Sequence, residues 1–311
     1  MITLDPALKA MLDRARLKPM DWRAPVETLR REFWRQAHKL EAEGPSLLEI
    51  RNLQVGGAAG SLPARLYVPY AAGITSPGLV FFHGGGFVVG DLDSHEMLCR
   101  RIAASARIRV LSVAYRLAPE HRWPAAPEDA LAATRWAFAH AGEIAFDPAR
   151  IAVGGDSAGG NLSAVVAQGL KREGHAPLGA QVLIYPCTQF LKMTPSQISY
   201  KEGYFLTQAA QDFFVRQYLA DKANVYDWRA SPLIADDLAG LAPAYVVTAG
   251  FDPLLDEGKA YADKLAACGV PVTYREYRDQ VHGFFNMTAI SKVARDAIAD
   301  TGAWLAKTLN A

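Results

Sequence analysis

The chain has 311 residues, of which 50% are hydrophobic and 21% are charged, and its formal net charge is +1. These values are typical of a globular protein with a substantial core, and they give no electrostatic reason to expect nucleic acid or an anionic membrane surface as a partner. No stretch approaches the roughly 18 apolar residues of a membrane span, and the charged N-terminal segment lacks the apolar core of a secretory signal. The three cysteines, Cys99, Cys187 and Cys268, are too widely spaced to indicate a zinc site or a disulfide framework. We therefore expect a cytoplasmic protein without a metal or other cofactor.

Apolar residues recur at steps of three and four over residues 1–45, which predicts amphipathic helices interrupted by prolines. Two alternating stretches around the sequence "GGAAG" then predict a β-hairpin, and "GGAAG" itself lacks the following helix that a dinucleotide site needs. After residue 78 short apolar strands alternate with helices, which is typical of a mostly parallel sheet covered on both faces. With the hairpin, eight strands are expected: 47–55, 61–69, 78–82, 108–115, 150–155, 180–186, 244–250 and 272–277. The clearest helices are expected at 126–141 and 256–269.

Residues 187–232 break this alternation, because they contain many aromatic residues and no strand pattern. An ordinary helical excursion is one interpretation. We favour a lid, built together with the N-terminal helices over the carboxyl edge of the sheet, where ligand sites of such sheets lie. The chain is accordingly divided into N-terminal cap helices (1–45), an α/β domain (46–186 and 233–311) and a cap insertion (187–232).

The sequence "GDSAG" at residues 155–159 is a G-x-S-x-G pattern between a predicted strand and a predicted helix. In this context a serine sits on a sharp, strained turn, and glycines two residues away on either side leave room for it. Ser157 would then lie at a helix N-terminus, where free N–H groups favour developing negative charge. A glycine turn that happens to hold a serine is the alternative. Asp156 is not expected to act as a catalytic acid, and its side chain should point away from that of Ser157.

A serine hydroxyl needs a base, and in this architecture the partners follow in the order serine, acid, histidine. Only His175 and His282 follow Ser157 in the chain. His175 lies in a polar loop soon after the helix that follows the serine, whereas His282 comes directly after the last predicted strand. His282 is therefore the predicted base.

The acid must lie in a loop after a strand, between the serine and the histidine. Asp252 follows the apolar run 244–250 and is the preferred candidate. Its carboxylate would orient the imidazole of His282 and stabilise the charged form of the ring. Asp256 and Glu257 are the alternatives, but they are expected to begin the following helix. Glu257 is expected to hydrogen-bond in this loop without a catalytic role.

The sequence "HGGG" at 83–86 ends another predicted strand. Consecutive glycines let backbone N–H groups turn toward one point, which suits an oxyanion hole. Gly84, Gly85 and Gly86, together with the N–H of Ala158, are the predicted donors. Asp91, Asp93 and His95 alternate as metal ligands can, but directly after this loop a structural role is favoured over a metal site.

These motifs make the chain similar to the hormone-sensitive-lipase family of α/β-hydrolases, in its bacterial carboxylesterase branch with "GDSAG". The matching stretches are "HGGGFVVGD" at 83–91, "YRLAPEHRWPAAPEDA" at 115–130, "GDSAGGN" at 155–161, "DPLLDEG" at 252–258 and "HGF" at 282–284. The resemblance implies an α/β-hydrolase fold with a helical cap, a triad of Ser157, Asp252 and His282, and hydrolysis of short- to medium-chain acyl esters.

The same triad could act on amides, lactones or carbamates, and plant relatives use this fold as a small-molecule receptor. The resemblance also suggests a homodimer through the last strand, residues 272–277.

Overall fold

One eight-stranded sheet organises the part of the chain that the computed structural model describes, residues 3–17 and 20–310. Its strands are β1 Glu49–Gly57, β2 Gly60–Val68, β3 Ser76–Phe82, β4 Arg109–Val113, β5 Phe146–Asp156, β6 Ala180–Ile184, β7 Ala244–Phe251 and β8 Val272–Val281. The strand order is β1-β2-β4-β3-β5-β6-β7-β8. Strand β2 is antiparallel to β1 and β4, and the other neighbours are parallel. The predicted mostly parallel sheet of eight strands is therefore confirmed.

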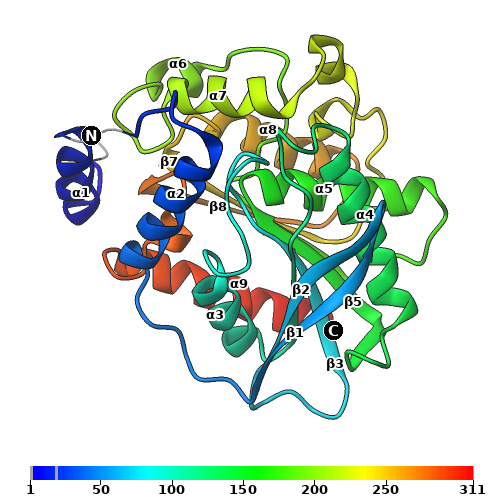
Figure 1. Ribbon diagram of the computed structural model, residues 1–311. Helices are drawn as coiled ribbons and strands as arrows, with labels where there is room; N and C mark the ends of the chain where they lie inside the picture. Colours follow the sequence, from blue (N-terminus) through cyan, green and yellow to red (C-terminus); the bar gives the residue numbers. More distant parts are fainter. Residues whose placement is uncertain (1–2, 18–19, 311) are drawn as a thin grey trace.

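Helices cover both faces of this sheet (Figure 1). One face is covered by α4 Ala125–Ala139, α5 Ala158–Arg172 and α8 Leu255–Ala267, and the other by α3 Glu96–Ala106 and α9 Lys292–Leu309. The strands in the middle of the sheet are buried along their whole length because both of their faces are covered, which explains their continuous apolar sequences. The helices predicted at 126–141 and 256–269 correspond to α4 and α8 and are confirmed.

The remaining helices lie beyond the carboxyl edge of the sheet or beside it (Figure 1). They are α1 Pro6–Leu17, α2 Val26–Leu40, α6 Pro195–Ser199 and α7 Gln208–Tyr218, with short 3₁₀ turns η1 Lys222–Tyr226, η2 Pro232–Ile234 and η3 Phe284–Asn286. Residues 187–232 are all described and contain no strand, as expected. Within residues 3–17 and 20–310, none of these helices is long and apolar enough to cross a membrane.

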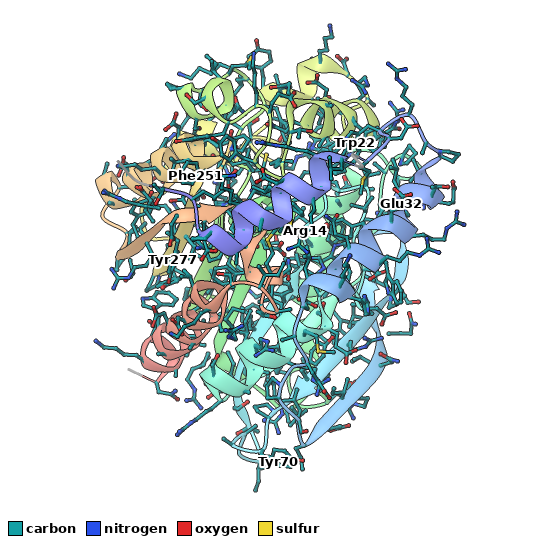
Figure 2. The ribbon with its side chains drawn as sticks, turned by 90° about the vertical axis from the view of Figure 1, so that its left-hand side faces the viewer. Arg14, Trp22, Glu32, Tyr70, Phe251 and Tyr277 are labelled. Carbon is teal, nitrogen blue, oxygen red and sulfur yellow. The ribbon has the colours of Figure 1, made fainter. Side chains whose placement is uncertain are left out.

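Helix α1 is attached to the far end of the chain. Leu8 and Leu12 on its inner side form a separate small core with Val281 and Met287, and the N–H of Asp5 pairs with β8. Figure 2 shows α1 lying across this side of the molecule, with Trp22 beyond its C-terminal end. The N-terminal segment is thereby fixed next to the loop that follows β8.

The last strand is longer than expected. The pattern predicted it over 272–277, but β8 continues to Val281, which pairs with Phe251 after a register shift that follows Ala249. The alternation of apolar residues fades in this part because β8 is an edge strand, and most of its residues are only half buried. The extension brings His282 to the edge of the sheet.

Four strands of the sheet end directly before residues that the sequence analysis selected. The loop 83–86 follows β3, Ser157 follows β5, Asp252 follows β7 and His282 follows β8. Because these strands are parallel, their carboxyl ends meet at one edge. The fold therefore gathers four distant segments at one place.

Candidate active site

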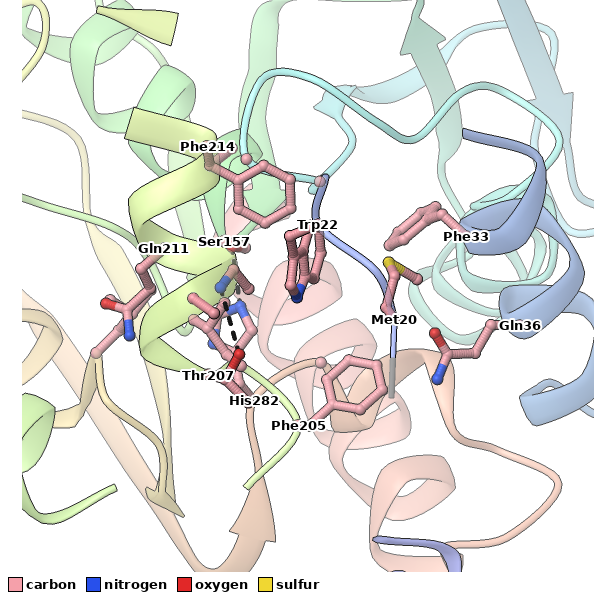
Figure 3. Close-up of a pocket in the computed structure, with 18 of the residues that line it drawn as sticks. Met20, Trp22, Phe33, Gln36, Ser157, Phe205, Thr207, Gln211, Phe214 and His282 are labelled. Carbon is pink, nitrogen blue, oxygen red and sulfur yellow. Dashed lines mark hydrogen bonds between the residues drawn. The ribbon is translucent and has the colours of Figure 1, made fainter. Parts of the chain in front are cut away.

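Ser157, His282 and Asp252 form one hydrogen-bonded chain. The imidazole Nε2 of His282 lies 2.9 Å from the Oγ of Ser157 (Figure 3). The Nδ1 of the same ring lies 2.8 Å from Oδ2 of Asp252. Asp252 is fully buried, and its second carboxylate oxygen accepts the N–H of Leu254. Because the Asp252 carboxylate can only accept a hydrogen bond, Nδ1 of His282 carries the proton. The lone pair of Nε2 therefore faces the hydroxyl of Ser157. The structure brings together the three side chains that the sequence analysis selected.

The serine occupies a strained backbone position, with φ 55° and ψ −114° at the N-cap of α5. Side chains at the neighbouring glycines would collide with the backbone. An added Cβ at Gly155 would lie 2.5 Å from the carbonyl carbon of Gly159, and one at Gly159 would lie 2.6 Å from that of Phe82. These glycines therefore permit the turn that lifts Ser157 above the sheet.

Three residues that line the same cavity as Ser157 have backbone N–H groups without a hydrogen-bond acceptor among the described residues. They are Gly85, Gly86 and Ala158. Gly85 has φ +118° and Gly86 has φ +60°, which are conformations that glycine adopts most readily. Ala158 is the first residue of α5, where N–H groups have no partner within the helix.

The prediction that the Gly84 N–H is an oxyanion donor is wrong. This N–H donates to Oδ1 of the buried Asp156 at 2.8 Å, so it is not free to bind a substrate oxygen. A buried carboxylate requires donors, and the neighbouring loop supplies one. Asp156 itself is not part of the hydrogen-bonded chain, in agreement with the sequence analysis.

The alternative acids have other partners. Asp256 accepts the N–H of Ser196, and the buried Glu257 accepts the N–H of Thr188 at 2.7 Å. Burial raises the pKa of Glu257 to about 8. Both carboxyl groups therefore connect the start of α8 to residues 187–232 and leave Asp252 as the partner of His282.

The alternative histidine, His175, is half buried after α5 and packs against Phe138. It is not part of the chain of hydrogen bonds that reaches Ser157.

A cavity of about 1770 Å³ opens above Ser157. Its walls are mainly apolar and come from two segments that are far apart in the sequence (Figure 3). The N-terminal segment contributes Met20, Trp22, Phe33 and Gln36, and residues 187–232 contribute Phe190, Phe205, Thr207, Gln211 and Phe214. The rings of Trp22 and Phe214 meet edge to face at 5.2 Å between centroids, which joins the two segments over the loop 83–86.

The sequence analysis did not identify Met20 or Trp22 as lining residues. They lie between α1 and α2, where the periodic pattern of residues 1–45 is interrupted and does not show which way a side chain points. The density of aromatic residues in 187–232 indicated a wall but not which rings form it.

Comparison with known proteins identifies the family of the chain. A family model described as the alpha/beta hydrolase fold matches residues 79–286. The carboxylic ester hydrolase LipN of Mycobacterium tuberculosis is 46% identical over 293 residues, which cover 92% of this chain and 78% of that protein. The carboxylesterase NlhH of the same organism is 37% identical and covers 99% of this chain and 97% of that protein. An ester hydrolase from the metagenome of Lake Arreo, solved with a bipyridine phosphonate derivative, has a TM-score of 0.96 and 38% identity, covering 99% of this chain and 100% of that chain. The chain therefore belongs to the α/β-hydrolases, in the hormone-sensitive-lipase family.

Proposed function

We propose that this protein is a serine carboxylesterase that hydrolyses short- to medium-chain acyl esters through Ser157, His282 and Asp252. Carboxylic ester hydrolysis as the general activity rests on the names of relatives that align over most of the chain. The observation that carries the mechanism is the continuous hydrogen-bonded chain from Ser157 through His282 to Asp252. In the same cavity, three backbone N–H groups have no acceptor within residues 3–17 and 20–310.

In the proposed reaction, Nε2 of His282 takes the proton of Ser157 while Oγ attacks the ester carbonyl carbon. The carbonyl oxygen becomes an oxyanion, and the N–H groups of Gly85, Gly86 and Ala158 stabilise it. The bond to the alcohol oxygen then breaks, and the imidazolium returns its proton to the leaving alcohol. Water, activated by the same imidazole, releases the acid from the acyl-enzyme.

We further propose that the segments before residue 46 and between 187 and 232 act as a cap that selects the substrate. Support comes from the cavity walls, which these two segments supply above the serine. Next to Gly86 the rings of Trp22 and Phe214 crowd the space above the oxyanion donors, which favours small acyl groups there. The apolar walls favour uncharged esters, because a charged group would lose its hydration in them.

The test is hydrolysis of a p-nitrophenyl ester series from acetate to palmitate by the wild type and by Ser157→Ala. We expect turnover that is highest for acyl chains of about two to eight carbons and that disappears in the variant. Wild-type turnover that persists in Ser157→Ala would exclude the mechanism. A matched ester and amide of the same acid then decide between esterase and amidase activity, and faster cleavage of the ester is expected.

A further inference from the structure

A second cluster of polar side chains lies below the oxyanion loop and is not used by the reaction described above. His83, His95 and Asp156 are all buried, and Tyr115 packs beside them. Buried ionisable groups are costly unless they have partners, so the contacts of each one are informative.

Asp156 connects this cluster to the loop. Its Oδ1 accepts the N–H of Gly84 at 2.8 Å, and a Cβ added at Gly84 would lie 2.5 Å from Oδ2. The carboxylate and the Gly84 backbone are therefore in direct contact, and no larger residue fits there. The N–H groups of the next two residues, Gly85 and Gly86, have no acceptor in the described part of the chain. The Gly85 N–H belongs to the peptide group that carries the Gly84 carbonyl, so fixing residue 84 sets its direction. The Gly86 N–H belongs to the next peptide group, whose carbonyl accepts the N–H groups of two later residues of the loop.

His95 is the ion-pair partner of Asp156. Its Nε2 lies 3.3 Å from Oδ1 of Asp156, which is an ion-pair contact between two buried side chains. Burial lowers the pKa of His95, but the carboxylate of Asp156 outweighs this and the pKa lies above its ordinary value. Burial also raises the pKa of Asp156, and the His95 charge and the Gly84 N–H together bring it below its ordinary value. Each group favours the charged form of the other.

The opposite side of the loop is fixed by neutral groups. Nδ1 of His83 lies 2.7 Å from the carbonyl oxygen of Gly84, and the hydroxyl of Tyr115 donates to the carbonyl oxygen of His83. Burial and the charge of His95 hold the pKa of His83 well below its usual range, so His83 is the uncharged member. The backbone of residues 83–84 is therefore bonded at the N–H group of Gly84 and at both carbonyl groups.

We propose that His95 and Asp156 are positioning residues for the oxyanion hole. The contact with His95 keeps the Asp156 carboxylate directed at the Gly84 N–H, and this bond fixes residue 84 and thereby aims the N–H group of Gly85 at the substrate oxygen. The inference rests on the proposed esterase function. Because the oxyanion exists only in the transition state, weakening the pair lowers kcat and leaves KM largely unchanged.

The experiment compares His95→Phe, His95→Gln and the wild type with p-nitrophenyl butyrate. Each preparation is titrated with a phosphonate that reacts with the serine, so that kcat refers to active molecules only. We expect kcat to fall about 100-fold in His95→Phe and about 10-fold in His95→Gln, which keeps an N–H donor but loses the charge. KM should stay within about twofold in both, because the ground-state contacts are unchanged.

A second measurement uses a trifluoromethyl ketone, which forms a reversible tetrahedral oxyanion with the serine. Its inhibition constant should rise by the same factor as kcat falls, since it requires the same N–H groups. Asp156→Asn should resemble His95→Gln, and the double variant should lose little more than either single variant because both break one link.

The control is Ile102→Val, which removes a methyl group from the buried core of α3, the helix that follows His95. It tests whether general loosening of this helix matters, and its kcat and inhibition constant should stay unchanged. The positioning role would be overturned if both His95 variants kept kcat and the inhibition constant of the ketone within twofold of wild type. It would also be overturned if the variants changed only KM. The proposed function is tested separately by Ser157→Ala, so the two failures are distinguishable.

Discussion

Gly86 offers the sharpest test of how the loop and the cavity wall fit together. Its backbone has φ +60°, and an added Cβ would lie 2.5 Å from Cδ1 of Phe214. Ordinary contacts of this kind begin at 3.4 Å. In Gly86→Ala the ring or the loop must therefore yield by at least 0.9 Å, the difference between those two distances, because Cγ of the ring lies closer still. The ring cannot move freely because Trp22 packs against it.

Two costs add up in Gly86→Ala. The left-handed backbone costs alanine about 1 kcal/mol, and overpacking against Phe214 costs about 1–3 kcal/mol. We expect the free energy of unfolding, measured in urea, to fall by about 2–4 kcal/mol. A shift of nearly 1 Å in the Gly86 N–H should also reduce kcat/KM for p-nitrophenyl butyrate about 100-fold. Adding Phe214→Ala should recover much of both losses, because the colliding ring is then absent.

Gly174→Ala is the matched control. Gly174 has φ +65°, but nothing lies within 4 Å of its added Cβ. This variant should therefore show only the backbone cost of about 1 kcal/mol and keep full activity. The reasoning is refuted if Gly86→Ala is no less stable than Gly174→Ala and equally active, or if removing the Phe214 ring in the double variant recovers nothing.

Three further predictions concern carboxyl groups. Asp252→Asn should lower kcat for ester hydrolysis about 10⁴-fold, because the amide disturbs the tautomer of the His282 imidazole. The kcat of Asp256→Asn should stay within a few fold of wild type, and equal losses in the two variants would contradict the assignment. Burial raises the pKa of Glu41 to about 8, so folded wild type retains a proton that the unfolded chain releases, and its stability falls as pH rises from about 5 to 8. The free energy of unfolding of Glu41→Gln should not show this fall, so its advantage over wild type should grow by on the order of 3 kcal/mol between pH 5 and 8. Urea unfolding measures both proteins, and a difference between them that stays the same across this range would refute the prediction. Asp129 is fully buried and accepts hydrogen bonds from Nε and Nη2 of Arg116. Asp129→Asn should therefore lower the free energy of unfolding in urea by about 3 kcal/mol, and a loss below about 0.5 kcal/mol would contradict this.

The sequence alone determined the features that depend on local order along the chain. Short apolar strands that alternate with helices defined the parallel sheet, and the glycines around Ser157 marked a strand-to-helix turn. Since parallel strands deliver their following residues to one edge, chain order was enough to select Asp252 and His282 from their competitors. Their distances of 2.8 and 2.9 Å agree with that selection.

Contacts between segments with no common pattern needed the tertiary structure. Gly84 looks like its neighbours in "GGG", but its N–H is bonded to a carboxylate 72 positions away. Trp22 and Phe214 meet over Gly86 although they lie in separate, irregularly patterned segments, and His95 reaches Asp156 only because α3 begins beneath the loop. Periodicity reports which side of an element is buried, whereas pairings such as these depend on how elements pack against each other, so only the folded chain decides them.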